Sequence, residues 1–218
     1  MGGDLACQSS KNLETLHYLD KVFDLSNPNT FWAPGNHDYD RPELLSQFTK
    51  RPAFFSAYKD GTTFLVLDSQ LDSSNIRGEQ LALFNRVTDT LSETKHLVLL
   101  HHKLIWLYHH PLLESLADSI ANAAICDQLY CINPNNFYED IYPKLVKIKR
   151  AGIDVVLLAG DIGTKVKAFE YQTKEGIFFL ATGVNGDDAG DKVLIFRNDL
   201  KTGKLSWKFL PVSALPQR

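Results

Sequence analysis

Apolar side chains recur along the chain at two different spacings. Four stretches carry them three or four positions apart, the spacing of amphipathic helices: 11–25, 78–91, 112–125 and 138–150. Three short, nearly continuous apolar runs predict buried strands between these helices: 30–33, 96–100 and 154–159. The alternation of helices with strands is typical of a layered α/β protein.

The remaining segments predict turns, loops and further strands. Residues 54–58 and 63–68 flank Lys59-Asp60-Gly61 and predict a β-hairpin. The last third of the chain predicts four more strands: 166–171, 177–182, 192–197 and 205–210. Residues 126–136 are rich in Asn, Pro and Cys and predict a loop that overhangs a site. We therefore expect one domain over 1–218, with a cap-like insertion near 105–136.

Composition narrows the classes of protein that this chain can represent. Its 218 residues are 44% hydrophobic and 22% charged, as in an ordinary globular protein with its own core. The net charge of -3 gives no general attraction to nucleic acid, and the apolar runs are too short to span a membrane. The start of the chain shows no secretory pattern, so we expect a cytoplasmic protein, in which Cys126 and Cys131 are free thiols rather than a disulfide.

Four polar clusters follow predicted strands or lie near the start of the chain. They are Gly3-Asp4, Gly35-Asn36-His37-Asp38, His101-His102 and Gly160-Asp161-Ile162-Gly163. Side chains at the ends of neighbouring strands can converge on one crevice. Oxygen and imidazole ligands together suit divalent ions such as manganese, iron or zinc. The clusters therefore predict a metal site.

In order and spacing, these clusters resemble the signature of the calcineurin-like metallophosphoesterase superfamily. Gly35-Asn36-His37-Asp38 matches its Gly-Asn-His-Asp/Glu motif in full, and Val98 to His102 matches its strand that ends in histidine. The resemblance covers nearly the whole chain. It implies a four-layer α/β/β/α sandwich and a hydrolase, a phosphatase or phosphodiesterase, that cleaves phosphate esters with metal-activated water.

Two motifs of the superfamily do not transfer to this chain. The Asp-x-His motif expected before Gly3-Asp4 is absent, and the Gly-His-x-His position reads Gly160-Asp161-Ile162-Gly163. All but one of the missing groups serve the first of the two metals in the resemblance. We therefore expect one ion rather than two, weak activity, and a sandwich that lacks the usual first strand. The alternative is that the natural protein extends upstream.

The resemblance also assigns roles to individual residues. Asp4 would bridge metals, Asn36 and His101 would bind the second metal, and His37 would protonate the leaving oxygen. Asp161 takes the place of a histidine ligand, so manganese or magnesium is favoured over zinc, with manganese first and iron also compatible. His102 is expected to contact substrate. The alternative for Asp4 and Asp161 is that each caps a helix or turn.

Several alternatives stay open from the sequence. His109 and His110 precede Pro111 and so match a His-His-Pro sequence that is common in the superfamily. His101 is nevertheless preferred as the ligand, because it directly follows the apolar run. The chain is either a metal-dependent phosphoesterase or a catalytically degenerate module that binds a phosphorylated ligand or a partner protein. A Ser-His-Asp hydrolase is not favoured, because no Gly-x-Ser-x-Gly motif occurs.

Overall fold

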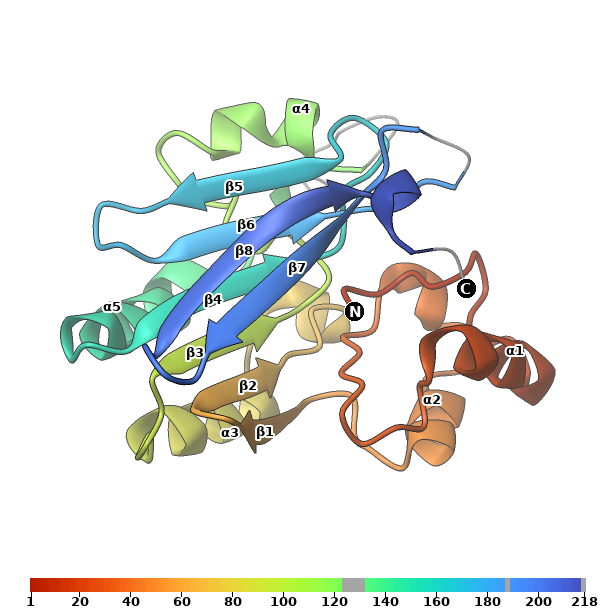
Figure 1. Ribbon diagram of the computed structural model, residues 1–218, viewed down its shortest axis with the longest axis horizontal. Coiled ribbons are helices and arrows are strands. Elements are labelled where there is room, and N and C mark those ends of the chain that lie inside the picture. The colour runs from red at the N-terminus through yellow and green to blue at the C-terminus, as the bar shows by residue number, and fades with distance from the viewer. Residues whose placement is uncertain (123–131, 187–188, 217–218) are drawn as a thin grey trace.

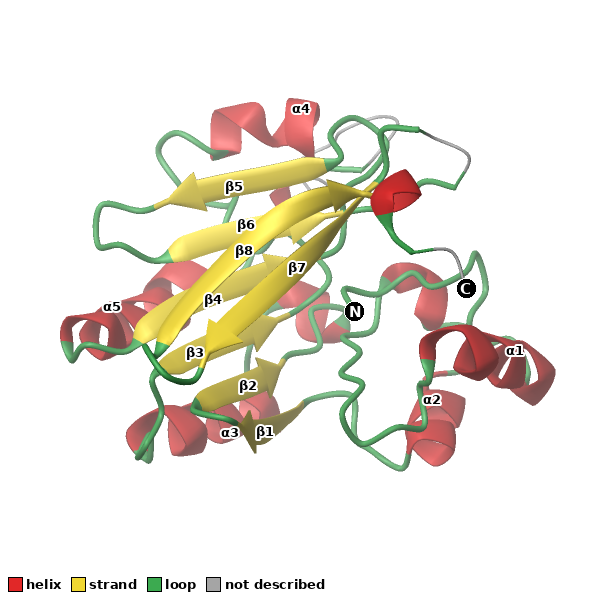
Figure 2. Ribbon diagram, in the orientation of Figure 1, coloured by secondary structure: helices red, strands yellow, loops and turns green. Residues whose placement is uncertain are grey.

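A six-stranded mixed sheet forms the centre of the computed structural model, which describes residues 1–122, 132–186 and 189–216 (Figures 1 and 2). The strand order is β1-β2-β3-β4-β6-β5. The strands are β1 (Phe55–Lys59), β2 (Thr62–Val66), β3 (His96–Leu100), β4 (Asp154–Ala159), β5 (Ala168–Gln172) and β6 (Phe178–Thr182). β2, β3, β4 and β6 run parallel, while β1 and β5 pair antiparallel at the two edges. The predicted α/β class is confirmed.

Helices cover one face of this sheet and form a lobe beyond the strand ends (Figure 2). The α-helices are α1 (Leu13–Phe23), α2 (Pro42–Thr49), α3 (Gly78–Asp89), α4 (Ala117–Ile120) and α5 (Tyr142–Arg150). Phe84 of α3 and Leu145 of α5 are fully buried against the sheet. α1 and α2 share a separate small core, to which Leu16, Leu19 and Trp32 belong. Among the residues described, no helix is long and apolar enough to cross a membrane.

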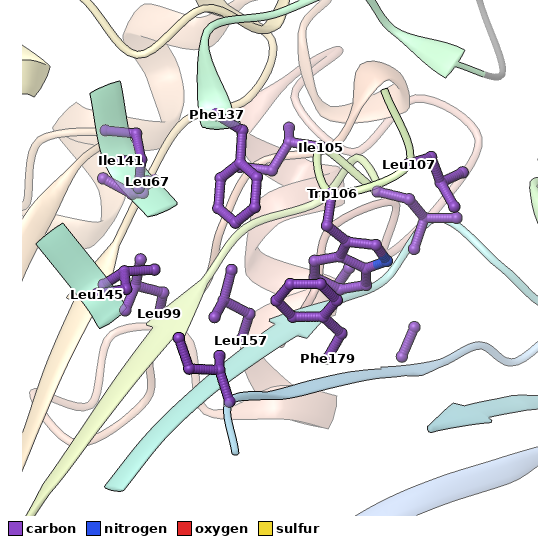
Figure 3. Close-up of a cluster of buried hydrophobic side chains, with 14 of the residues drawn as sticks. Leu67, Leu99, Ile105, Trp106, Leu107, Phe137, Ile141, Leu145, Leu157 and Phe179 are labelled. Carbon is purple, nitrogen blue, oxygen red and sulfur yellow. The ribbon is translucent and has the colours of Figure 1, made fainter. Parts of the chain in front are cut away.

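The main core lies between the helices and the sheet, and aromatic rings fill its centre (Figure 3). Trp106 and Phe179 are fully buried, and their rings stack with centroids 5.1 Å apart. Phe137 lies edge-on to Phe179, with Leu99 and Leu157 in the same cluster. Trp106 lies shortly after β3, so this packing anchors the chain directly after His101 and His102, which follow the strand.

A two-stranded sheet packs on the opposite face of the central sheet. β7 (Lys192–Asp199) and β8 (Lys204–Pro211) form an antiparallel hairpin that crosses over β4 and β6 in Figure 1. Its Phe196 and Trp207 pack against Val98, Val156 and Leu180 of the central sheet. Helices, central sheet and hairpin thus form three layers over the described residues. The four-layer sandwich stays a prediction.

The structure departs from the predicted elements in three places. Residues 30–33 are extended but belong to neither sheet, and they are held instead by hydrogen bonds to Met1. In the described part of the predicted helix 112–125, only a short 3-10 turn and α4 are helical, and α2 was not predicted. Of the four strands predicted in the last third of the chain, β5 and β6 join the central sheet, and β7 and β8 form the second one.

The predicted cap-like insertion near 105–136 is only partly described. Its first residues, Ile105 to Leu107, are fully buried in the main core. Cys126, Cys131 and most of the predicted overhanging loop lie outside the described residues.

Candidate functional site

The four polar clusters meet beside the carboxyl ends of β3 and β4, where the N-terminal segment is packed against them. The backbone of the N-terminal segment can approach these strand ends closely because glycines stand at the points of contact. A Cβ on Gly160 would stand 2.2 Å from the carbonyl oxygen of Gly2, and a Cβ on Gly35 would stand 2.1 Å from Oδ1 of Asp4. Only glycine fits such contacts. These glycines therefore allow Asp4 to reach the strand ends.

The side chain of Asp38 links, through hydrogen bonds, the two loops that carry Asp4 and Asn36. Its side chain is fully buried, and Oδ2 accepts hydrogen bonds from the backbone N–H groups of Asp4 and Gly35, both at 2.8 Å. The indole N–H of Trp32 donates to the same oxygen at 3.1 Å. Burial raises the pKa of Asp38. One carboxylate thus fixes the start of the chain relative to the turn Asn36–Asp38.

Asp4 presents both of its carboxylate oxygens to predicted site residues. Oδ1 accepts a hydrogen bond from the backbone N–H of His37 at 2.9 Å, and Oδ2 lies 3.4 Å from Nε2 of His102. Its φ of 53° is left-handed, a conformation that Asp tolerates better than most residues. Burial alone would raise the pKa of Asp4, but the hydrogen bonds and charges of His102 and His37 bring it below its usual range.

His102 is the centre of the cluster. Its Nδ1 lies 2.5 Å from the carbonyl oxygen of Gly2, and its Nε2 lies 3.2 Å from Oδ1 of Asn36 and 3.8 Å from Oδ1 of Asp161. Burial would lower the pKa of His102, but the hydrogen bond to Asp4 and the charges of Asp161 and Asp4 raise it. Both ring nitrogens face oxygen atoms. The carbonyl oxygen of Gly2 can only accept a hydrogen bond, and so can the carboxylate oxygens of Asp4 and Asp161 when they are ionised. These contacts favour the imidazolium form of the ring, unless a bound cation takes the place of the proton on Nε2.

Asp161 follows β4 and completes the cluster. It is 4% exposed, and its backbone N–H donates to the carbonyl oxygen of His102 at 3.1 Å. Its Oδ1 is buried and has no hydrogen-bond partner among the described residues. Burial raises the pKa of Asp161, the charge of His102 opposes this, and the charge of Asp4 adds to it. A buried carboxylate oxygen without a donor is costly unless a ligand or ion meets it.

His101, predicted as the metal ligand, lies on the other side of β3. Its Nδ1 is 2.7 Å from the carbonyl oxygen of Lys103, and its ring lies edge-on to Trp106 with centroids 5.0 Å apart. The side chain is fully buried, and burial lowers its pKa to about 4. The structure therefore brings His102, and not His101, to Asp4, Asn36 and Asp161.

The alternation of side chains along β3 contains the signal that separates the two histidines. Successive residues of a strand point to opposite faces. Leu97 and Leu99 belong to the main core under the helices, whereas Val98 faces the hairpin. His101 continues the first set and His102 the second.

His37 stands at the exposed rim of the cluster. Its Nδ1 is 3.0 Å from the carbonyl oxygen of Cys7, and its side chain is exposed. The turn that carries it is tied to Asp4 through its own backbone N–H. His109 is exposed, and His110 packs against Tyr171, with ring centroids 5.1 Å apart.

A second group of polar residues borders the cluster and was not predicted. Asp68 is fully buried after β2 and accepts hydrogen bonds from the hydroxyl of Tyr39 and, at 2.9 Å, from the N–H of Gln70. Ser69 Oγ accepts from the backbone N–H groups of His102 at 3.3 Å and Lys103 at 2.9 Å. The sequence signal was present, because Asp68 ends the predicted strand 63–68 and Ser69 directly follows it.

In the part of the chain that the structure describes, no group of three or more His, Cys, Asp or Glu residues is arranged to hold a metal ion. Comparison with protein-family models and with curated proteins gives no match to this chain. The metallophosphoesterase resemblance therefore stays a prediction from the sequence motifs.

Proposed function

We propose that this protein is a metal-dependent phosphoesterase that binds one divalent ion beside His102. One observation carries the proposal: Nε2 of His102 faces the carboxylates of Asp4 and Asp161 while Nδ1 is committed to a backbone carbonyl. Histidine ligands in metal sites commonly donate the other ring N–H to such a carbonyl. The four-layer sandwich implied by the resemblance belongs to the same proposal.

The donor set comes close to the spacing that a single ion requires: the oxygens of Asn36 and Asp4 are at ligand spacing from Nε2 of His102, whereas Oδ1 of Asp161 would have to move closer. The oxygens of Asn36, Asp4 and Asp161 lie 3.2, 3.4 and 3.8 Å from Nε2 of His102. Neighbouring ligand atoms on one ion are about 3.0–3.4 Å apart when the bonds are about 2.1 Å. The unpartnered Oδ1 of Asp161 is the atom that most needs such a ligand. Three oxygens and one imidazole favour manganese, with magnesium, iron or zinc also compatible.

The protein side chains have distinct roles in this proposal. Such an ion lowers the pKa of water and neutralises charge on phosphoryl oxygens. Asp4, Asn36, His102 and Asp161 hold it, and the carbonyl of Gly2 orients the ring of His102. His37, at the exposed rim, gives a proton to the departing alkoxide of a phosphate mono- or diester. His101 contributes no ligand and serves the core.

Hydrolysis of p-nitrophenyl phosphate, with and without manganese, tests this function. We expect manganese-dependent turnover that is lost in Asp161→Asn and reduced about 100-fold or more in His37→Ala. His17→Ala is the matched control, because His17 is an exposed histidine on α1, away from the cluster. Turnover that is independent of manganese, or unchanged in both site variants, would contradict the proposal.

A catalytically degenerate binding module is the second candidate. It is favoured by the lack, among the described residues, of any three His, Cys, Asp or Glu residues arranged around an ion. In that case the imidazolium of His102 neutralises Asp4 and Asp161, and the cluster recognises a phosphorylated ligand or partner without cleaving it. Phosphate binding without turnover, at any manganese concentration, would favour this candidate over the enzyme.

A further inference from the structure

Lys103 directly follows the paired histidines, and hydrogen bonds hold its backbone beside the cluster. Its N–H donates to Oγ of Ser69 at 2.9 Å, and its carbonyl oxygen lies 2.7 Å from Nδ1 of His101. The residue is half-buried, which is unusual for lysine. Its ammonium group donates to Oγ of the fully buried Ser74 at 3.2 Å. The charge is therefore placed by the fold and is not free in solvent.

The surroundings leave much of this ammonium group without a protein partner. The charge interacts with the carboxylates of Asp161 and Asp68, yet no carboxylate oxygen of the described residues lies within 4.0 Å of Nζ. Among those residues, Ser74 is its one hydrogen-bond acceptor. A lysine ammonium has three donors. At least two donors thus remain for water or for an anionic ligand.

The segment that holds the ammonium group is itself strained. Asp72, Ser73 and Ser74 have consecutive φ values of 46°, 52° and 75°, all left-handed and none of them glycine. Such conformations persist where the surrounding structure enforces them, and they are concentrated at binding sites. Here the last of the three strained residues is Ser74, whose hydroxyl contacts Lys103.

We propose that the ammonium group of Lys103 binds a non-bridging oxygen of a terminal phosphoryl group and so selects phosphate monoesters over diesters. The inference rests on the proposed function, because the phosphoryl group must sit beside Asp161 and His102. A monoester carries up to two negative charges on its phosphoryl group and a diester one, so a fixed cation favours the monoester. Lysine is a common phosphate ligand because it presents a compact point charge.

The test measures phosphate binding and ester preference separately, in the presence of manganese. Binding of inorganic phosphate is measured by calorimetry, and kcat/KM is compared for p-nitrophenyl phosphate and bis(p-nitrophenyl) phosphate. In Lys103→Met we expect about ten- to a hundredfold weaker phosphate binding. The monoester-to-diester ratio of kcat/KM should fall by a similar factor. Lys174→Met is the control, because Lys174 has a 91% exposed side chain, and it should change neither quantity.

Each outcome decides for or against the inference. Phosphate binding and ester preference that are unchanged in Lys103→Met would overturn it, as would a wild-type protein that binds no phosphate. Binding that depends on Lys103 without any turnover would support the anion site while refuting the enzyme. If Lys103→Met does not fold, Lys103→Gln replaces it. Ser74→Ala removes the hydroxyl that positions the ammonium group, so this variant should also weaken phosphate binding.

Discussion

Acidification should destabilise this protein through His101 more than through an ordinary histidine. The side chain is fully buried, its Nε2 has no partner among the described residues, and burial lowers its pKa from 6.5 to about 4. As the pH falls, the unfolded chain binds a proton on this residue near pH 6.5, whereas the folded protein does so only near pH 4. The free energy of unfolding therefore falls between these two values and is fully reduced below the lower one.

The size of this loss follows from the shift in pKa. A change of one in pKa corresponds to about 1.4 kcal/mol, so the fall from 6.5 to about 4 corresponds to about 3 kcal/mol. That is a large part of the about 5–15 kcal/mol that stabilises a typical domain. Burial also raises the pKa of Asp38 and Asp161, so acidification acts on these carboxyl groups as well. The effect of His101 must therefore be isolated by comparison with a variant.

Urea unfolding, followed by tryptophan fluorescence between pH 7 and pH 4 in the presence of a chelator, makes this comparison. His101→Gln keeps an amide donor for the carbonyl of Lys103 but cannot gain a proton. We expect the wild type to lose about 3 kcal/mol more than this variant over the range. His17→Gln, at an exposed position, should follow the wild type. Parallel profiles for the wild type and His101→Gln would refute the placement of a neutral histidine in the core.

Two further predictions concern packing. Gly160→Ala places a Cβ where it would stand 2.2 Å from the carbonyl oxygen of Gly2, so it should displace the N-terminal segment and abolish manganese binding; unchanged binding in a calorimetric titration would contradict this. Phe179→Ala removes a fully buried ring that stacks on Trp106 and should cost about 3–5 kcal/mol in urea unfolding; a loss below about 1 kcal/mol would show that this ring is not central to the core.

The strands of the central sheet were largely predictable because their signal is local. The runs 96–100 and 154–159 are apolar and end in polar residues, and the structure forms β3 and β4 with these bounds. The hairpin of β1 and β2 was also predictable, because Lys59-Asp60-Gly61 is a turn sequence. Gly61 has a φ of 78°, a conformation that favours glycine. Where the apolar pattern and the turn chemistry agree, little tertiary information is needed.

Other features depend on tertiary contacts that no local pattern contains. Residues 30–33 have the composition of a strand, but their backbone partner is Met1 rather than a sheet. α2 is an exception, because Pro42 at its start is a local signal that suits the first turn of a helix. The choice between His101 and His102 needed the two faces of β3, which are known only once the helices and the hairpin are placed.

Metal content per chain tests the central claim most directly. The protein is loaded with manganese, desalted and analysed for its metal, beside His102→Gln, Asp161→Asn and His101→Gln. We predict about one ion per chain in the wild type and in His101→Gln, and none in the other two variants. No bound metal in the wild type, or an ion that survives both site variants and is lost in His101→Gln, would contradict the site at His102.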